Sequence, residues 1–342
     1  MAMNDIGIDL GTTSVIVALE GKGVILNEPS VVAVDHRHDD KVLAVGNEAF
    51  AMVGRTPAYI SAERPLKDGV ISNHVLTKKM IQQFVNRVYD SRVIKPRVAV
   101  CVPAAITGIE SDAVVEAVVS AGARQVFLID EPIAAALGSG IDITQPKGHM
   151  FIDLGGGTTD IAVISLGGKV QANSIAVAGN LLDEEIVKEV RQKFSLVIGL
   201  RTAEELKKAV ACCPQRKFSE SMEVKGRSLI TNLPQRQIVK TEDLYEPVMR
   251  CVEQLGVAAH QVLERTPPEL AGDIYSEGVV LTGGVAQLKG LAEYFREKLK
   301  VDVRVADDPV NCVAMGTARS LSMGDQLETG FYDATPRVGH RR

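Results

Sequence analysis

The sequence lacks the patterns that mark a disulfide framework or a zinc site. Its five cysteines are odd in number, and no two of them form a Cys-x-x-Cys pair. Its six histidines show one close spacing, His36-x-His38, in a polar stretch that is interpreted as surface. We therefore expect free, buried thiols and no zinc site.

Long hydrophobic runs and a strong charge of one sign are also missing. No apolar stretch approaches the roughly 18 residues of a membrane span, and the start, Met1 to Asp5, has no basic region. The formal net charge of −5 gives no broad cationic field, which argues against nucleic acid as the main ligand. We expect a cytoplasmic protein. With 342 residues, 46% hydrophobic and 24% charged, the chain is long enough for two globular domains.

The stretch from Phe151 to Ile164, here called hairpin 2, has the pattern of a phosphate-binding turn. An apolar strand leads into Asp153, three glycines and two threonines follow, and a second β-rich run leaves. Glycines tolerate φ > 0 and have no Cβ, so successive backbone N–H groups can turn toward an anion. A carboxylate beside phosphates needs a cation between them, so Asp153 is predicted to hold Mg²⁺ through water. Alone, such a hairpin is more often a simple turn.

A second copy of this arrangement, here called hairpin 1, spans Ile6 to Val17 and contains Asp9. Internal repetition is much more specific than a single match. Two hairpins that each bring an aspartate can clamp the tail of a nucleotide around one metal ion. The predicted nucleotide ligands in the two hairpins are Asp9, Gly11, Thr12, Thr13, Ser14, Asp153, Gly155, Gly156, Gly157 and Thr158.

The rest of the chain alternates between strand and helix patterns. Before hairpin 2 we expect strands at 23–34, 97–103 and 125–129 and helices at 73–88, 111–121 and 132–138. After it we expect helices at 182–194, 202–211, 241–264, 287–298 and 311–321, with strands at 276–282 and 301–306. The predicted division is a first domain at 1–147, a second at 148–310, a helix at 311–323 that returns to the first, and a flexible tail at 324–342.

These motifs resemble the actin-like ATPase superfamily, and within it the MreB family of bacterial filament proteins most closely. Six further segments between residues 5 and 321 carry the resemblance: Leu26–Val32, Gly54–Pro57, Lys67–Ile71, Lys95–Val98, Asp130–Ala136 and Thr266–Ala271. The resemblance implies an α/β fold of two lobes, each built on a ribonuclease-H-like mixed sheet with flanking helices. It also implies that ATP binds in the cleft between the lobes.

The resemblance assigns roles to residues that match the family's motifs. Asp9 and Asp153 correspond to the Mg²⁺-side carboxylates, Glu131 to the water-activating carboxylate, and Thr158 to the second water-positioning residue. A structural role for Glu131, as a carboxylate at a helix start, is an alternative that can coexist with catalysis. The implied adenosine contacts are Glu204, Glu205 and Lys207 on one helix, and Gly283, Gly284, Val285 and Ala286 at a strand-to-helix turn.

The chain departs from the family pattern at two of these places. Val285 stands where the family usually has a third glycine, and a branched side chain there restricts the backbone. Ala209 and Ala211 stand where the family has a glutamate followed two places on by glycine. The missing carboxylate removes an expected hydrogen bond to the ribose.

The function implied is a polymerising ATPase that directs rod-shape determination and cell-wall elongation. Its partners would be further copies of itself, cell-wall elongation proteins and the inner face of the cell membrane. Val93 and Ile94 occupy the position of the family's membrane loop, although they could instead be the buried start of the next strand. The alternative function is an actin-like filament protein for plasmid segregation or organelle positioning, because that class shares both the hairpins and polymerisation. A sugar kinase or a chaperone would need an insertion or a substrate domain that the sequence does not show.

Overall fold

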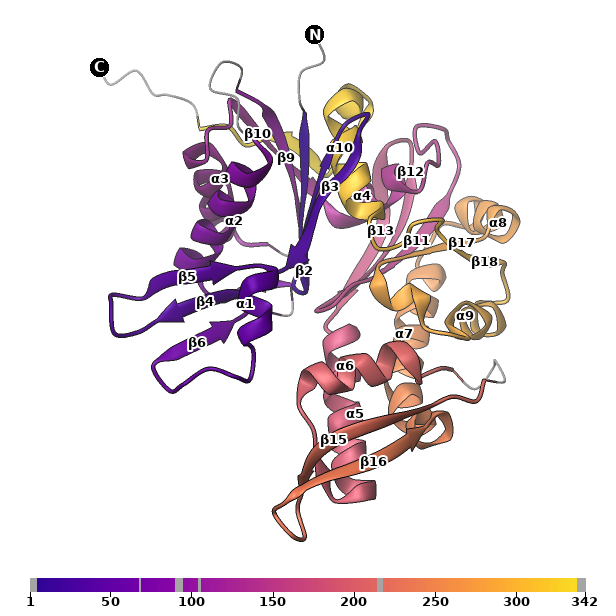
Figure 1. The fold of residues 1–342 in the computed structure, drawn as a ribbon. Coiled ribbons are helices and arrows are strands. Elements are labelled where there is room, and N and C mark those ends of the chain that lie inside the picture. Colours follow the sequence, from indigo (N-terminus) through magenta and orange to yellow (C-terminus); the bar gives the residue numbers. More distant parts are fainter. Residues whose placement is uncertain (1–4, 68, 90–94, 104–105, 214–217, 337–342) are drawn as a thin grey trace. The chain divides into compact units, whose positions relative to one another are not determined.

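The computed structural model describes residues 5–67, 69–89, 95–103, 106–213 and 218–336. The chain divides into two compact units, shown in Figure 1. Unit 1 comprises Met1–Lys147, Ile164–Val170 and Val310–Arg342, and unit 2 comprises Gly148–Val163 and Gln171–Pro309. A short piece of chain from the middle of the sequence, residues 164–170, therefore belongs to the first unit.

The main sheet of unit 1 is mixed and has the strand order β19-β10-β9-β1-β2-β3. The strands β1 (Ile6–Leu10), β2 (Ser14–Leu19) and β3 (Gly23–Pro29) are antiparallel. The strands β9 (Arg97–Val102) and β10 (Gln125–Asp130) run parallel to β1. Five of the six residues of β9 are buried, which is the burial expected for a central parallel strand.

Two pairs of helices cover the two faces of this sheet (Figure 1). The helices α2 (His74–Val88) and α3 (Gly108–Ser120) lie on one face, where Ile6, Ile8 and Leu10 of β1 join their core. The helices α4 (Glu131–Gly138) and α10 (Cys312–Met323) lie on the other. The side chains of a strand alternate between faces, so Gly7 of β1 faces α10.

Glycines allow α10 to approach its neighbours closely. A Cβ at Gly316 would lie 1.7 Å from the carbonyl oxygen of Ala134 in α4, and a Cβ at Gly7 would lie 2.3 Å from the backbone nitrogen of Ala318. Neither position can hold a larger residue unless the backbone shifts. The helix near the C-terminus is thereby fixed against both α4 and β1.

A smaller sheet completes unit 1. It contains β4 (Val32–Asp35), β5 (Lys41–Val45) and β6 (Ile60–Glu63), with α1 (Asn47–Met52) beside it, and is followed by the short pair β7 (Leu66–Lys67) and β8 (Val70–Ile71). The predicted continuous strand at 23–34 is wrong. The chain leaves the main sheet after Pro29, where the hydroxyl of Ser30 donates to the carbonyl of Gly11, and β4 then pairs with β5 and β6.

Unit 2 is built on a sheet with the order β13-β12-β11-β17-β18. Its strands are β11 (His149–Leu154), β12 (Thr159–Ser165), β13 (Gly168–Ile175), β17 (Val279–Thr282) and β18 (Val303–Val305). The pairs β11–β17 and β17–β18 are parallel. The predicted strand at 276–282 begins only at Val279, because the residues before Gly278 still belong to a helix.

Helices and a second small sheet complete unit 2. The helices are α5 (Gly179–Phe194), α6 (Leu200–Ala209), α7 (Tyr245–Glu264), α8 (Pro268–Glu277) and α9 (Leu291–Leu299). The small sheet consists of β14 (Leu196–Val197), β15 (Ser221–Ser228) and β16 (Pro234–Lys240), none of which the sequence predicted. Helix α5 packs against α6 and α7, and α9 packs against α7 and β18.

The predicted flexible tail is wrong for residues 324–336. Strand β19 (Phe331–Asp333) pairs antiparallel with β10, and the ring of Phe331 stacks on that of Phe127 with 5.2 Å between centroids. The pairing depends on a partner about 200 residues earlier in the chain, so local hydrophobic periodicity could not reveal it.

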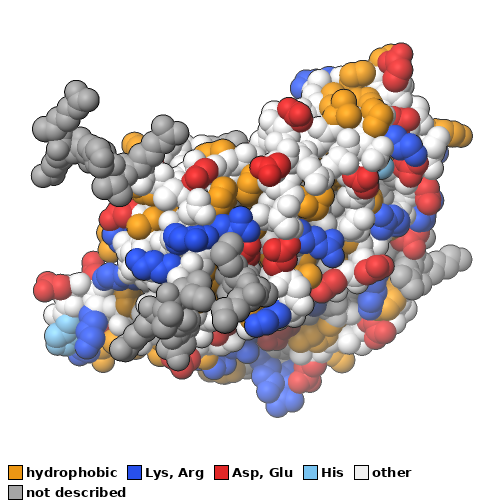
Figure 2. All heavy atoms as spheres, turned by 90° about the horizontal axis from the view of Figure 1, so that it is seen from above, with side chains coloured by type: hydrophobic (Ala, Val, Ile, Leu, Met, Phe, Trp, Pro, Cys, Tyr) orange, Lys and Arg blue, Asp and Glu red, His pale blue; other side chains and the backbone are white. Residues whose placement is uncertain are grey.

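Three expectations from composition can be compared with the structure. The five cysteines are free and buried, as predicted. None of the helices in the described part of the chain is both long enough and apolar enough to cross a membrane. On the face drawn in Figure 2, Lys and Arg side chains lie interspersed with Asp and Glu, so that face carries no field of a single sign.

Candidate functional site

Hairpin 1 forms the tight turn between β1 and β2. The backbone N–H of Gly11 donates to the carbonyl of Ser14 over 3.1 Å and closes the turn. A Cβ at Gly11 would lie 2.8 Å from the same carbonyl oxygen, so glycine is required for the turn to close. Asp9 is a residue of β1 and lies two positions before this turn.

The turn of hairpin 1 is held from outside by residues for which the sequence predicted no role. Ser30 Oγ donates to the Gly11 carbonyl over 2.6 Å, and Arg64 Nη1 donates to the Thr13 carbonyl over 2.8 Å. The backbone N–H of Gly69 donates to the hydroxyl of Thr12 over 3.2 Å. A serine and an arginine far along the chain give no local signal, because their role appears only when the sheet forms.

The hydroxyl of Thr13 differs from that of Thr12. It is buried, and within the described part of the chain it has no hydrogen-bond partner. A buried hydroxyl without a partner is costly and uncommon in folded proteins. Its place in the turn of hairpin 1 fits a ligand with oxygen acceptors, such as a phosphate.

Hairpin 2 repeats the same turn between β11 and β12. The backbone N–H of Gly155 donates to the carbonyl of Thr158 over 3.0 Å, at the same three-residue spacing as in hairpin 1. Two backbone N–H groups at the start of α5 then donate to the turn, from Gly179 to Gly155 over 3.1 Å and from Asn180 to Gly156 over 2.8 Å. These bonds fix hairpin 2 on the helix N-terminus.

Asp153 lies at the end of β11, next to the turn of hairpin 2. Its side chain is buried, and its Oδ1 accepts a 2.5 Å hydrogen bond from the hydroxyl of Thr282 on β17. The two residues are register partners in the parallel pair of strands, so the sheet itself brings them together. This hydrogen bond orients one carboxylate oxygen of Asp153.

The turn after β17 follows directly from Thr282 and contains Gly283 and Gly284. Gly283 has a φ of +83°, and a Cβ there would lie 2.3 Å from the carbonyl oxygen of Leu154 at the end of β11. A Cβ at Gly284 would meet nothing within 4 Å. The first glycine is therefore needed for packing against hairpin 2, whereas the second borders open space that a ligand could occupy.

Gly179 is the point where three of the predicted segments meet in unit 2. A Cβ at Gly179 would lie 3.2 Å from Lys207 Nζ, 3.2 Å from Val285 Cγ2 and 3.4 Å from the carbonyl oxygen of Gly155. The structure thus brings together residues of hairpin 2, α6 and the turn after β17. Gly179 itself was not predicted, although a glycine before a helix is a weak signal of close approach.

Lys207 makes two contacts at this point. Its Nζ donates to the carbonyl of Gly179 over 2.8 Å and lies 2.9 Å from the carboxylate of Asp183 on α5. Burial raises the pKa of Asp183 to about 6, although the positive charge of Lys207 acts in the opposite direction. Asp183 was missed because its signal, one acidic residue among the buried positions of an amphipathic helix, is weak.

The two predicted glutamates of α6 differ in their surroundings. Glu204 is half-buried, pairs with Lys208 over 2.6 Å, and its negative charge helps to raise the pKa of Asp183. Glu205 is exposed and pairs with Arg201 over 3.4 Å. The structure therefore places Glu204 beside the cluster at Gly179, and no described contact brings Glu205 there.

The proposed catalytic and metal residues occupy the following places. Glu131 is the first residue of α4, and Thr158 is half-buried at the end of the turn of hairpin 2. Within the described residues, no group of three or more His, Cys, Asp or Glu side chains could form a metal site. Asp9 lies in β1 of unit 1, and Asp153 lies in β11 of unit 2.

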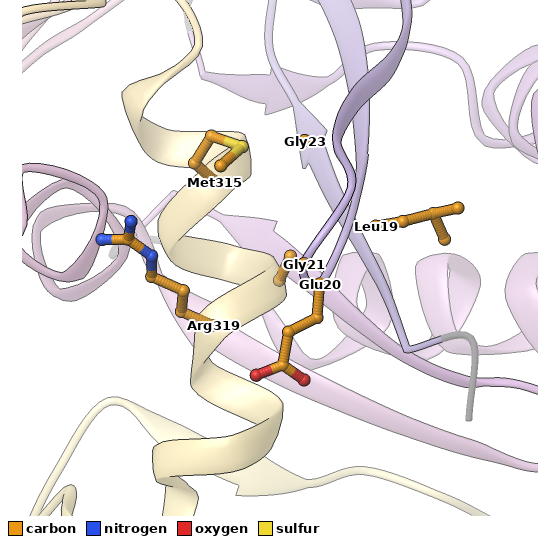
Figure 3. A pocket seen from close by; sticks show the side chains of 7 residues that line it. Leu19, Glu20, Gly21, Gly23, Met315 and Arg319 are labelled. Carbon is orange, nitrogen blue, oxygen red and sulfur yellow. The ribbon is translucent and has the colours of Figure 1, made fainter. Parts of the chain in front are cut away.

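A surface pocket of about 460 Å³ lies elsewhere in unit 1 (Figure 3). It is lined by residues of the turn between β2 and β3 and by α10, including Leu19, Gly21, Met315 and Arg319. Strand β2 runs from Ser14 at hairpin 1 to Leu19 at this pocket. The pocket is therefore separated from hairpin 1 by the length of the strand and is not part of the candidate site.

The mixed sheets and the repeated hairpins define an actin-like fold, and solved structures share it. The crystal structure of MreB5 of Spiroplasma citri bound to AMPPNP matches with a TM-score of 0.88 and 34% identity, covering 94% of this chain and 96% of that one. The MamK double helical filament matches in fold, with a TM-score of 0.74 and 22% identity over 93% and 98% of the two chains. The predicted fold class is confirmed.

Sequence comparison narrows this class further. A family model described as MreB/Mbl protein matches residues 3–329. The cell shape-determining protein Mbl of Bacillus subtilis (strain 168) is 47% identical over 328 residues, covering 96% of this chain and 98% of the relative. The cell shape-determining protein MreB of Escherichia coli (strain K12) is 42% identical over 330 residues, covering 95% of each chain. The chain belongs to the MreB/Mbl family of cell shape-determining bacterial actin homologues.

Proposed function

We propose that this protein binds Mg·ATP through hairpins 1 and 2 and hydrolyses it in the course of polymerisation. The observation that carries the proposal is the repeated hairpin, whose two copies close in the same way, with N–H···O distances of 3.1 Å at Gly11 and 3.0 Å at Gly155. The buried hydroxyl of Thr13 supports an oxygen-rich ligand at the first copy. The S. citri MreB5 structures with AMPPNP and with ADP support a nucleotide as that ligand.

In this proposal the residues of the two hairpins hold the phosphates. Asp9 and Asp153 hold Mg²⁺ through water, and the ion, when bound, neutralises charge on the phosphate oxygens. Thr158 and Glu131 orient the attacking water, with the Glu131 carboxylate accepting its proton. The nucleoside is held by Glu204, Glu205 and Lys207 of α6 and by Gly283, Gly284, Val285 and Ala286 after β17.

The residues that depart from the family pattern, Val285, Ala209 and Ala211, affect the expected affinity for the nucleotide. Val285 is largely buried and lies against Gly179, so its branched side chain fills space beside the cluster. Ala209 is exposed at the end of α6, and Ala211 is buried just beyond it. We expect these residues to weaken the contacts to the nucleoside more than those to the phosphates, because both hairpins keep their glycines.

We further propose that the assembled protein is a homopolymer that lies on the inner face of the cell membrane and directs rod shape and cell-wall elongation together with cell-wall elongation proteins. Membership of the MreB/Mbl family supports this role. Val93 and Ile94, the predicted membrane contact, lie outside the described residues. Strand β9 begins at Arg97, and Lys95 before it is exposed. A role in plasmid segregation or organelle positioning remains the second candidate, and the family relationship favours cell shape over it.

Electron microscopy of the purified protein with ATP and with vesicles that contain anionic lipid tests this proposal. The expected result is filaments that form with ATP and lie flat on the vesicle surface. Samples without nucleotide, and samples without lipid, separate the two requirements. A protein that stays unassembled with ATP and lipid would contradict the proposal. Filaments that form freely but never contact lipid would favour the second candidate.

A further inference from the structure

Asp130 occupies an unusual position at the start of α4. It is the N-cap residue of this helix and directly precedes Glu131. An aspartate at an N-cap ordinarily accepts a hydrogen bond from a backbone N–H in the first turn of its helix. The start of α4 has no such side-chain bond. Instead, Asp130 Oδ2 pairs with Lys169 Nζ, which comes from the beginning of β13.

The backbone of Asp130 is held by the C-terminal segment. Its N–H donates to the carbonyl of Gly330 over 2.8 Å. Gly330 has a φ of +76°, and a Cβ there would lie 3.0 Å from Asp130 Oδ2 and 3.2 Å from Ile133 Cγ1. Gly330 therefore packs against both Asp130 and the first turn of α4, immediately before β19 pairs with β10.

The same C-terminal segment also holds the turn that carries Lys169. The backbone N–H of Lys169 donates to Thr329 Oγ1 over 3.3 Å, and the N–H of Glu328 donates to the carbonyl of Gly167 over 3.2 Å. The side chains of Asp130 and Lys169 are 17% and 25% exposed, so solvent screens their ion pair only in part. The end of β10, the start of β13 and the C-terminal segment thus form one connected structure within unit 1.

We propose that Asp130, held by Lys169 and Gly330, is a positioning residue for Glu131. We call these three residues the Asp130 clamp. The clamp fixes both the side chain and the backbone of the residue next to Glu131, whose Cα lies one peptide unit away, about 3.8 Å. A group that orients water must be held to within a fraction of an ångström. The proposal rests on the proposed hydrolysis by Glu131 and adds the residues that set its position.

ATP hydrolysis by three variants tests the proposal, two of them at Lys169 and one at a control site. Lys169→Met removes the charge but keeps most of the side-chain length, and Lys169→Arg keeps the charge. Lys78→Met is the control, because it removes the lysine of a different ion pair in unit 1, the pair between Lys78 and Glu116. Hydrolysis is measured on protein whose assembly is checked by sedimentation, and ATP affinity is measured by calorimetry.

The clamp predicts that Lys169→Met lowers kcat tenfold or more while the KM for ATP stays within about twofold of wild type. Lys169→Arg should recover most of the rate, and Lys78→Met should behave as wild type. Asp130→Asn provides a second variant if Lys169→Met folds poorly, and it should show the same loss of kcat without a change in affinity.

The outcomes separate this proposal from the proposed function. If assembled wild type does not hydrolyse ATP, the proposed function fails and the clamp fails with it. If Glu131→Gln abolishes hydrolysis but Lys169→Met and Asp130→Asn keep the wild-type kcat, the clamp alone is wrong. An equal loss of kcat in Lys78→Met would also overturn it, because the effect would then be general destabilisation of unit 1.

Discussion

Lys207 on α6 bridges two parts of α5, with its Nζ 2.8 Å from the carbonyl oxygen of Gly179 and 2.9 Å from the carboxylate of Asp183. The carboxylate is buried, and this burial raises its pKa to about 6 despite the nearby lysine. Asp183 therefore changes charge just below neutral pH, at the point where hairpin 2, α6 and the turn after β17 meet.

The first prediction concerns this titration. Between about pH 4 and pH 6 the folded protein keeps a proton on Asp183 that the unfolded chain has released, so stability falls as the pH rises through this window. Above pH 6, where Asp183 is ionised in both states, the difference in pKa lowers the free energy of unfolding by about 3 kcal/mol. Asp183→Asn should remove this contribution. Urea unfolding of the nucleotide-free protein at pH 4.5 and pH 6.5 measures the change.

Asp243 supplies a control, because its pKa is shifted in the opposite direction from that of Asp183. Burial opposes the shift, but hydrogen bonds from the Lys240 backbone and from Lys193 lower the pKa of Asp243. Its contribution is present above its unfolded pKa and is lost as the pH falls. Asp243→Asn should therefore leave the change in stability between pH 4.5 and pH 6.5 nearly unaltered, and its own effect should appear only below about pH 4, in the opposite direction. Identical pH dependence in wild type and Asp183→Asn would contradict the assignment.

The second prediction is that Asp153→Asn weakens binding of Mg·ATP tenfold or more but has little effect on ATP in the presence of EDTA. An asparagine can still accept the hydrogen bond from Thr282, so the fold should remain, while the charge that attracts the metal is lost. Calorimetry with and without Mg²⁺ makes the comparison, and circular dichroism checks the fold. Unchanged affinity for Mg·ATP would show that Asp153 is not a metal-side ligand.

The third prediction is that Glu131→Gln slows ATP hydrolysis about a hundredfold or more while ATP affinity changes by less than about twofold. A group that orients water acts mainly in the transition state, so its loss should appear in kcat. Single-turnover hydrolysis by assembled protein provides the measurement. Hydrolysis at the wild-type rate would leave Glu131 with only the role of a helix N-terminal carboxylate.

The fourth prediction uses two adjacent glycines with different surroundings. Gly283→Ala should destabilise unit 2 by about 2 kcal/mol or more, because φ is +83° and the new Cβ would lie 2.3 Å from the Leu154 carbonyl oxygen. Gly284→Ala should leave stability nearly unchanged, since its Cβ meets no atom within 4 Å. If the nucleotide occupies that open space, Gly284→Ala should still weaken ATP binding. Thermal melts and calorimetry on both variants separate the two effects.

The fifth prediction is that Val93→Ser/Ile94→Ser prevents filaments from binding to lipid without preventing assembly. Two aliphatic side chains contribute only a few kcal/mol, at about 0.8 kcal/mol for each buried methylene, so a monomer should bind feebly and a filament should bind through many copies. Co-sedimentation with liposomes tests this after assembly has been verified for both proteins. Equal pelleting of both would place the membrane contact elsewhere.

The features that the sequence predicted well are those with a short repeat or a local signal. The two hairpins could be predicted because a glycine turn between apolar strands has a clear local pattern, and their turns close at Gly11 and Gly155. The helix predicted at 73–88 spans His74–Val88, and the side chain of Asn73 caps it by accepting from the Leu76 N–H. The resemblance to a known family then allowed the fold class to be predicted as well. Helix starts and strand ends differed by a few residues because tertiary contacts, not propensity, set them.

The features that the sequence did not reveal depend on contacts between distant segments. Ser30 and Arg64 support hairpin 1 from neighbouring loops, and Asp183 becomes part of the site only because α5 and α6 pack together. Strand β19 has too few residues for a periodic pattern and is defined by its partner β10. These residues have ordinary local surroundings in the sequence, so only the folded chain identifies them.

The glycine contacts of α10 have a consequence for how the protein is made. Gly7 in the first strand packs against Ala318, so the part of this sheet face over β1 and β2 stays uncovered until α10 has left the ribosome. Synthesis therefore passes through a long stage in which apolar strands are exposed, and a chaperone that shields them would raise the yield. A chain that stops before α10 should aggregate instead of forming a soluble half, even though its hairpins are complete.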